Sequence, residues 1–427
     1  MLANSKSILD ELHWRGLIHQ STDENALREQ LSKPTVVYAG FDPTADSLHV
    51  GSLLPLMMLR RFQQAGHQPI ALVGGATGMI GDPSGKSDER QLLSKDALAE
   101  NVRGIQSQME QFLDFSGSNP AIVVNNFDWM QNFSFLDFLR DVGKNFPINV
   151  MLTKDSVKSR LERTDSGLSY TEFSYMLLQA YDFVVLAKNK NCLLQIGGSD
   201  QWGNITAGID LGRRMLSKHL FGLTCPLLTT SDGKKMGKTE KGAVWLSADR
   251  TSPFEFYQYF INVADADVLM TLRFLSDVTE EQYRDLELSL RDKPHERAAQ
   301  NFLAQSLTRL VHGEEKLQAV QHATKLLFGA ELTSLTQNQL NAIFQNVPSQ
   351  EVPRQRLVDG LGIIDALCLA SLATSKSEAR RSVTEGAANV NNTKVTTPDR
   401  ILNEADLAGD YLILRIGKKR YGLLRFA

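Results

Sequence analysis

Cysteine is scarce in this sequence, where only Cys192, Cys225 and Cys368 occur in 427 residues. Their odd number and wide spacing match neither a disulfide framework nor a zinc site. We therefore expect reduced thiols in a cytoplasmic protein that binds no metal of its own. No apolar run is long enough to span a bilayer, which argues against a membrane protein. The first twenty residues lack an apolar core, so no signal or transit peptide is expected.

A large excess of one charge is also missing, because the net charge is only -3. This balance argues against a protein that coats nucleic acid non-specifically. The charge is nevertheless uneven, since residues 351–427 contain 12 Lys and Arg against 9 Asp and Glu. A basic tail on an acidic body is typical of selective contact with an anionic partner, although the charge alone favours a simple solvated protein surface.

Short aliphatic runs alternate with amphipathic helical patterns in the first half of the chain. The expected strands are 35–41, 69–75, 121–126 and 192–196, and the expected helices are 53–64, 88–113, 171–187 and 201–215. Such alternation predicts an α/β fold in which helices cover both faces of a parallel sheet. Ligands of these folds bind beyond the carboxyl ends of the strands.

The strand pattern fades after about Pro253, and helical patterns dominate to about residue 330. A segment rich in Gln and Asn follows, and the last 75 or so residues form a small α+β unit. We predict a catalytic domain over residues 1–225, a lysine-rich loop and α-helical domain over 226–330, a linker over 331–352 and a tail domain over 353–427.

Two segments have residues suited to phosphate. In FDPTADSLHVGSLLPL, residues 41–56, a helix is expected to begin near Gly51, where free N–H groups attract phosphate and His49 can donate to it. In SDGKKMGKTEKG, residues 231–242, Lys234, Lys235, Lys238 and Thr239 lie within six positions on a glycine-punctuated loop. Flexible ammonium groups suit phosphates whose charge moves during reaction. Taken singly, a capped helix and a solvated loop are the more ordinary explanations.

The expected helix 171–187 has a polar stripe on an apolar background. Tyr175, Gln179 and Asp182 stand four and then three residues apart, so they share one helix face. Polar groups are costly in a core unless they are hydrogen-bonded. The stripe therefore indicates either a pocket for a polar ligand or an exposed face.

In combination, the H-x-G element and K-M-G-K-T resemble the HIGH and KMSKS signatures of class I aminoacyl-tRNA synthetases. The segments YAGFDPTADSLHVG, LVGGATGMIGDPSGK, YMLLQAYD and LQIGGSDQWGNI are similar, in order and spacing, to the bacterial-type tyrosyl-tRNA synthetases. This resemblance covers essentially the whole chain. It implies a Rossmann-type catalytic domain, an α-helical domain and a small RNA-binding domain. It also implies a homodimer that uses L-tyrosine, ATP with Mg²⁺, and tRNA(Tyr).

The resemblance also assigns roles to individual residues. Tyr38 and Asp182 would bind the substrate phenol, Asp82, Tyr175 and Gln179 its ammonium group, and Gln201 would lie near its carboxylate. The nucleotide would lie against Gly40, Asp42, His49, Gly51, Gly198, Asp200 and Lys238. Charge on the reacting phosphates would be met by His49, Lys86, Arg90, Lys235, Lys238 and Thr239.

One position departs from the family pattern. The first signature normally ends in His, sometimes Asn, and here Ser52 occupies that catalytic position. A serine hydroxyl can still donate a hydrogen bond, but it is shorter than imidazole. We therefore expect a weaker contact in the adenylation step and some loss of rate, but not an inactive enzyme.

The tail resembles a small RNA-binding domain that is shared with a ribosomal protein of the small subunit. Lys376, Arg380 and Arg381 fall on one short predicted helix, an arrangement suited to phosphate contacts. In the family this domain grips the long variable arm of the tRNA. The alternative is a tail that only caps the body of the protein.

Three other functions are compatible with parts of the pattern. The tryptophanyl relatives share the fold and both signatures, but Tyr38 and Asp182 favour a substrate hydroxyl. An RNA-binding or splicing-assistance paralogue with weakened catalysis is suggested only by Ser52. A nucleotidyltransferase of cofactor synthesis would lack the helical and RNA-binding extensions.

Overall fold

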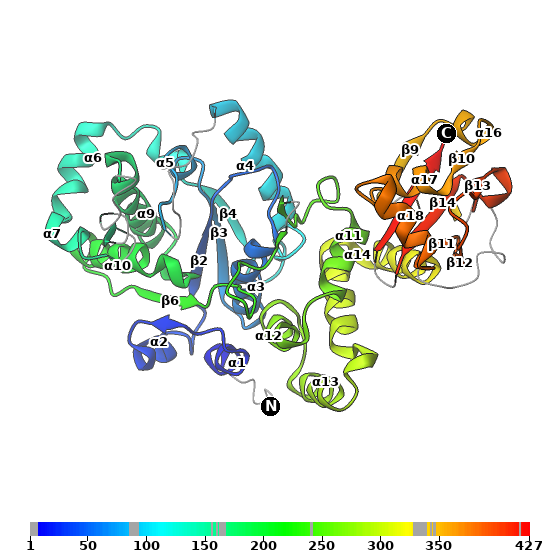
Figure 1. Ribbon diagram of the computed structural model, residues 1–427. Coiled ribbons are helices and arrows are strands. Elements are labelled where there is room, and N and C mark those ends of the chain that lie inside the picture. The colour runs from blue at the N-terminus through cyan, green and yellow to red at the C-terminus, as the bar shows by residue number, and fades with distance from the viewer. Residues whose placement is uncertain are drawn as a thin grey trace. The chain divides into compact units, whose positions relative to one another are not determined.

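The computed structural model describes residues 7–84, 94–154, 157–158, 161, 168–239, 242–327, 340–341, 344, 347–417 and 420–427. The chain forms two compact units, the first comprising residues 1–247 and 264–299 and the second 248–263 and 300–427 (Figure 1). No helix in the described residues is both long enough and apolar enough to cross a bilayer. The domain limits given above stay predictions.

The first unit is built on a six-stranded sheet in the order β1-β6-β5-β2-β3-β4. Its strands are β1 (Gln20–Ser21), β2 (Val36–Phe41), β3 (Gln68–Val73), β4 (Ile122–Asn125), β5 (Cys192–Gly198) and β6 (Phe221–Cys225). All neighbours pair in parallel except β1, which is antiparallel to β6. From β2 the chain adds β3 and β4 on one side of the sheet, and it then adds β5 and β6 on the other side of β2. The boundary between β2 and β5 is therefore the switch point where such sheets bind ligands.

Four long helices cover the sheet, with α9 and α10 on one side and α3 and α4 on the other (Figure 1). They are α3 (Val50–Gln64), α4 (Lys95–Met109), α9 (Tyr170–Asn189) and α10 (Trp202–Leu216). The fold class of a doubly wound α/β domain is thus confirmed. The helix predicted over 88–113 begins only at Lys95, because the side chain of Ser94 caps its first turn. The part of that prediction before residue 94 lies outside the described residues.

The rest of the first unit consists of short elements and two longer helices. They are α1 (Ile8–Arg15), α2 (Glu24–Gln30), η1 (Thr77–Met79), α5 (Phe127–Met130), α6 (Phe135–Asp141), η2 (Gly143–Asn145), α7 (Ile148–Met151), η3 (Ser199–Gln201), β7 (Lys238–Thr239), β8 (Gly242–Ala243), α12 (Asp265–Leu275), α13 (Glu280–Asp292) and η4 (Pro294–Glu296).

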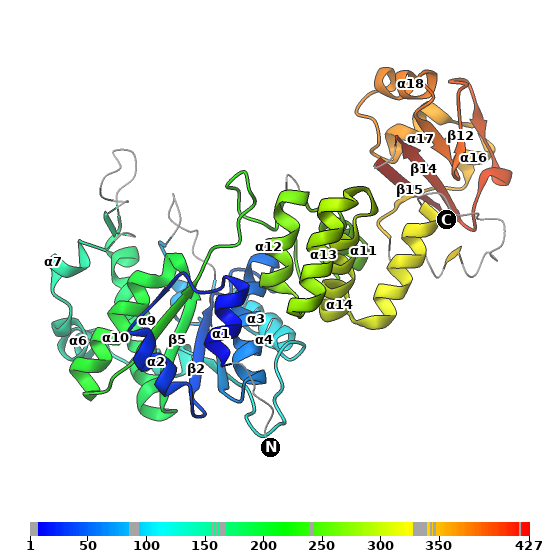
Figure 2. The ribbon, with the colours of Figure 1, turned by 90° about the horizontal axis from the view of Figure 1, so that it is seen from below.

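The second unit combines helices with a five-stranded sheet in the order β12-β11-β14-β15-β9. Its helices are α11 (Pro253–Ile261), α14 (Ala298–Leu327, within this unit from residue 300), α16 (Gln355–Val358), α17 (Ile363–Leu369), α18 (Lys376–Thr384) and η5 (Glu404–Asp406). Its strands are β9 (Gln350–Val352), β10 (Leu361–Gly362), β11 (Ala388–Val390), β12 (Thr393–Lys394), β13 (Ile401–Leu402), β14 (Tyr411–Ile416) and β15 (Arg420–Phe426). Buried side chains such as Leu367, Val383 and Leu412 give the tail its own core, with α17 and α18 near the strands (Figure 2). A small α+β tail is thus confirmed.

His312, on α14, is partly buried in the second unit. Its ring meets the edge of Phe256 with 4.9 Å between ring centroids, and its Nε2 has no hydrogen-bond partner among the described residues. Burial, with a smaller contribution from the charge of Lys316, lowers the pKa of His312 to about 4. The imidazole is therefore neutral in the folded protein at neutral pH.

This histidine is expected to make the second unit sensitive to acid. An unfolded chain takes up the proton near pH 6.5, whereas the folded protein takes it up only near pH 4. The free energy of unfolding should therefore fall by at most about 3 kcal/mol as the pH drops through that window. The variant His312→Phe should lose this part of the pH dependence in denaturant titrations at pH 7 and pH 4.5. The exposed His322→Phe is the control, and an equal effect of both variants would contradict the assignment.

Candidate active site

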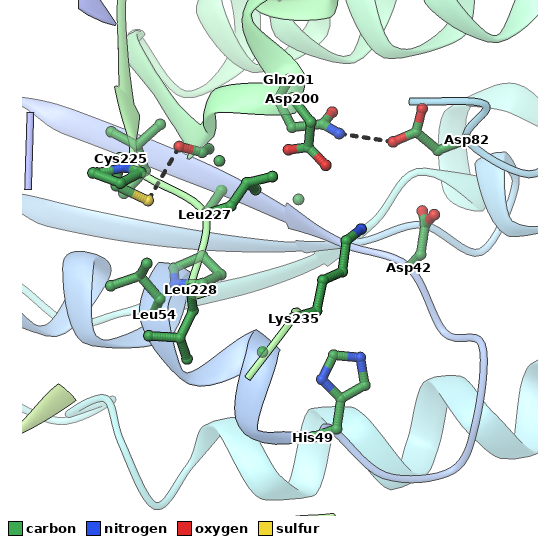
Figure 3. Close-up of a pocket in the computed structure, with 18 of the residues that line it drawn as sticks. Asp42, His49, Leu54, Asp82, Asp200, Gln201, Cys225, Leu227, Leu228 and Lys235 are labelled. Carbon is green, nitrogen blue, oxygen red and sulfur yellow. Dashed lines mark hydrogen bonds between the residues drawn. The ribbon is translucent and has the colours of Figure 1, made fainter. Parts of the chain in front are cut away.

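A cavity of about 400 Å³ opens at the carboxyl ends of β2 and β5, at the switch point of the sheet. It is lined by His49 and Lys235 of the two signature elements (Figure 3) and by Tyr175 and Gln179 of α9. The predicted site residues that line it are Gly40, Asp42, His49, Gly51, Asp82, Tyr175, Gln179, Gly198, Asp200, Gln201, Lys235 and Lys238.

Backbone pairing brings the two signature elements together. His49 forms an antiparallel bridge with Trp245, and the Val50 N–H donates to the Val244 carbonyl at 2.9 Å. The chain that returns from the lysine-rich loop is thereby joined to the start of α3. Gly237 completes the approach, since its φ is +84° and a Cβ there would lie 2.8 Å from Cβ of Val50. His49 and Lys238, far apart in the sequence, therefore line the same cavity.

His49 is held as a neutral donor next to two cations. Its pKa is lowered first by burial and further by the positive charges of Lys238 and Lys235. In Figure 3 the Lys235 side chain extends between His49 and Asp200. A neutral imidazole can donate one N–H to a phosphate oxygen without opposing the lysines. The site thus offers three donors at one end, two of them charged.

A network of amides and one carboxylate forms the opposite wall. Gln201 Nε2 donates to Asp82 Oδ2 at 2.7 Å, and Gln179 Nε2 donates to Gln201 Oε1 at 3.3 Å. Asn204, on α10, donates to Gln179 Oε1 at 3.0 Å and to Gln201 Oε1 at 3.2 Å. These oxygens suit an ammonium group. Asn204 was missed by the sequence analysis, although it stands three residues after Gln201 in the quoted motif.

The ends of β2 and β5 present backbone and carboxylates to the cavity. A Cβ at Gly40 would meet no atom within 4 Å, so this backbone borders open space. A Cβ at Gly198 would lie 2.8 Å from Asp200 Oδ1. The Tyr175 hydroxyl donates to Asp42 Oδ1 at 3.4 Å. The pKa of Asp200 is raised, mainly by burial and further by the charge of Asp82. Carboxylates beside bare backbone suit the hydroxyls of a ribose.

Tyr38 and Asp182, the predicted phenol pair, are neighbours but do not line this cavity. The hydroxyl of Tyr38 is buried without a hydrogen-bond partner among the described residues. Asp182 accepts from Trp129 Nε1 at 2.9 Å and from Asn126 Nδ2 at 3.0 Å. Burial outweighs these two bonds and raises the pKa of Asp182 to about 7. Asn126 was detectable as a polar residue at the end of a predicted strand, whereas nothing in the sequence marked Trp129.

The remaining predicted catalytic residues are not found among the described residues that line the cavity. Ser52 lies in the first turn of α3, does not line the cavity, and its N–H donates to the His49 carbonyl at 2.8 Å. Thr239 is exposed and donates through Oγ1 to the Gly242 carbonyl at 3.0 Å. Lys86 and Arg90 lie outside the described residues.

The three predicted RNA contacts share one exposed helix, α18. Lys376 pairs with Asp365 at 2.7 Å, and Arg380 with Asp399 at 3.7 Å. Exposed ion pairs of this kind are worth little free energy, so a phosphate can compete for these cations. Arg381 is also exposed on this helix.

Comparisons with known proteins identify the family of this chain. The family model described as tRNA synthetases class I (W and Y) matches residues 30–329. The model described as Tyrosine--tRNA ligase SYY-like C-terminal domain matches residues 339–424. A Tyrosine--tRNA ligase of Rhodopirellula baltica is 59% identical over 99% of this chain and 97% of its own length. One from Roseiflexus castenholzii is 51% identical over 98% of this chain and 99% of its own.

Solved structures of similar fold include aminoacyl-tRNA synthetases. A C-terminally truncated mitochondrial tyrosyl-tRNA synthetase of Aspergillus nidulans is 33% identical, with a TM-score of 0.69 over 76% of this chain and 95% of that one. A tryptophanyl-tRNA synthetase of Encephalitozoon cuniculi is 14% identical with a TM-score of 0.53, which shows only that the fold is shared.

A parallel sheet with two cationic signature elements at its switch point defines a class I aminoacyl-tRNA synthetase. Within that class, this chain belongs to the tyrosyl-tRNA synthetase family.

Proposed function

We propose that this tyrosyl-tRNA synthetase carries out both of its reactions at the cavity between β2 and β5. It would activate L-tyrosine with ATP and then transfer the tyrosyl group to the terminal adenosine of tRNA(Tyr). The observation that carries the proposal is the cavity lining, in which His49, Lys235 and Lys238 face the amide network of α9 and α10. Donors for phosphate thus lie opposite acceptors for an amino acid.

In the first step the tyrosine carboxylate attacks the α-phosphorus of ATP. This carboxylate is ionised at neutral pH, so the step needs no general base. A bond forms between its oxygen and the α-phosphorus while the bond to the bridging oxygen breaks, and pyrophosphate leaves with the electron pair. Lys235, Lys238 and neutral His49 would stabilise the charge that grows on the phosphate oxygens. Magnesium would arrive with the ATP phosphates and neutralise part of their charge.

The remaining lining residues would position the two substrates. Asp82, Tyr175 and Gln179 would surround the substrate ammonium group, with Asn204 fixing the amide of Gln179. Asp42 and Asp200 would accept from the ribose hydroxyls, and the backbone of Gly40 and Gly198 would border the nucleoside. Tyr38 and Asp182 would bind the phenol deeper in the protein. Such positioning replaces acid–base chemistry as the main source of rate.

In the second step a ribose hydroxyl of the terminal adenosine attacks the carbonyl of tyrosyl-adenylate. The new ester bond forms as AMP leaves, and the hydroxyl proton passes to the departing phosphate or to solvent. We propose that Lys376, Arg380 and Arg381 of α18 contact phosphates of the same tRNA.

Exchange of radioactive pyrophosphate into ATP tests the activation step. We expect exchange that depends on tyrosine and is much weaker with tryptophan. Exchange with tryptophan as good as with tyrosine would contradict the specificity. Absence of tyrosine-dependent exchange at high enzyme concentration would favour the RNA-binding paralogue instead.

We also propose a homodimer in the cytoplasm. Large apolar side chains are exposed on α6, α7 and the adjacent chain, namely Phe135, Leu136, Leu139, Ile148, Val150 and Leu152. Leu136 is 76% exposed, and a cluster of this kind marks a protein interface. A second copy of the chain is the expected partner, because the resembled family is dimeric. Sedimentation should show a dimer that Leu136→Asp weakens, and a wild-type monomer at micromolar concentration would contradict this.

A further inference from the structure

Helix α12 contacts the loop that carries Lys235 and Lys238. Asp267, in the first turn of α12, accepts the Ser231 N–H at 2.7 Å. Asp267 is only 6% exposed, so the carboxylate end of this charge-assisted bond is buried. One turn further along, the Thr271 hydroxyl donates to the Asp267 carbonyl at 2.8 Å and lies 3.6 Å from Met236 Sδ. Both residues belong to the first unit.

This contact with α12 restrains the loop close to both of its functional lysines, because Met236 directly follows Lys235 and stands two residues before Lys238. Met236 is 4% exposed, and its N–H donates to the Leu228 carbonyl at 2.9 Å. Thr229 and Lys235 form an antiparallel bridge, so this part of the loop is a short hairpin. Met236 and Lys235 both line the cavity, so the contact between Met236 Sδ and the Thr271 hydroxyl joins this wall of the cavity to α12.

The other end of α12 is tied to the helix that follows His49. Arg61, on α3, donates to the Phe274 and Ser276 carbonyls, both at 3.0 Å. Arg15, on α1, donates to the Ser276 carbonyl at 3.1 Å and to the Val278 carbonyl at 2.8 Å. The Phe274 and Ser276 carbonyls lie at the end of α12 and lack intrahelical partners, whereas Val278 follows in the chain beyond the helix. One helix thus connects both signature elements: α3 at its carboxyl end and the lysine loop at its amino end.

We propose that Asp267 and Thr271 are positioning residues that hold the lysine loop in register with His49 for the adenylation step. The bond from Asp267 reaches a loop N–H and not a free N–H of its own helix, so simple capping does not explain it. The inference rests on the proposed function. Wild-type exchange activity tests that function separately from the variants below.

The test is single-turnover formation of tyrosyl-adenylate at saturating ATP and tyrosine, together with the dissociation constant of tyrosine. We expect Asp267→Ala to slow adenylate formation about tenfold, because a charge-assisted bond is lost. Asp267→Asn, which can still accept from Ser231, should recover most of the rate. Tyrosine affinity should change by less than about twofold, because the loop lies across the cavity from the amino-acid wall.

Asp265→Ala is the matched control. Asp265 is in the same helical turn and carries the same charge, but its ion-pair partner is Arg297 at 3.9 Å. Thr271→Val keeps the shape of the side chain and removes the hydroxyl, and it should also slow adenylate formation. This second variant keeps the proposal testable if Asp267→Ala does not fold. Equal slowing by Asp265→Ala, an Asp267→Asn rate no better than that of Asp267→Ala, or unchanged rates in both the Asp267 and Thr271 variants would overturn the proposal.

Discussion

Replacing Asp182 by alanine is expected to abolish tyrosine binding while ATP binding is retained. Asp182 is 2% exposed and lies beside the Tyr38 hydroxyl, which has no hydrogen-bond partner in the described part of the chain. A substrate phenol between the two would donate to Asp182 and accept from Tyr38. Loss of a buried, charged hydrogen bond costs about 1.5–3 kcal/mol, and the Trp129 N–H, left without its acceptor, adds to that cost. We expect the dissociation constant for tyrosine to rise at least about 100-fold.

Fluorescence titration with tyrosine and equilibrium dialysis with ATP check this expectation. Asp210→Ala, which removes an exposed carboxylate paired with Arg213 and Arg214 on α10, is the control. The pKa of about 7 at Asp182 also predicts that tyrosine binding depends on pH. A phenol that donates to the ionised form should bind more weakly as the pH falls below 7, and this dependence should vanish with a ligand that lacks the hydroxyl. An unchanged tyrosine affinity in Asp182→Ala would refute the phenol site.

The parallel sheet was predictable because its strands are short and aliphatic and its helices are strongly periodic. β2, β3, β4 and β5 lie within one or two residues of their predicted limits. β6 was not predicted as a separate strand, because Phe221–Cys225 contains glycine and threonine and is only five residues long. Its buried position comes from pairing with β5, which is a tertiary contact that a local pattern does not contain.

The site was predictable only as far as residue type and motif order carry it. Twelve of the predicted residues line the cavity, because the switch point collects the ends of β2 and β5 together with α9. Asn204, Trp129 and Asp267 act through contacts with residues distant in sequence or through a neighbour's orientation. These contacts form only when the chain packs, so local residue spacing does not predict them. The position of Asp182 was not predictable either, because helix spacing and the family resemblance grouped it with Tyr175 and Gln179, whereas it does not line the main cavity.

Replacing Lys238 by alanine is expected to slow adenylate formation by about 10²–10³-fold through kcat, with little change in tyrosine affinity. Lys238 lines the cavity and its charge reaches His49, so it lies at the phosphate end and away from the amide network. A cation there gains most when pyrophosphate departs, because charge on the phosphates is then greatest. Removal of one preorganised donor for such charge has this magnitude in other enzymes.

The neighbouring Lys234 provides the control for that experiment. It lies on the same loop, but it is 81% exposed, does not line the cavity, and pairs with Asp232 at 2.8 Å. Lys234→Ala removes an equal charge and should change the rate by less than about twofold, because an exposed ion pair contributes little. Equal slowing by both variants would mean that the loop acts through its total charge. A rise in KM for tyrosine with unchanged kcat in Lys238→Ala would place this lysine at the amino acid and contradict a role on the phosphates.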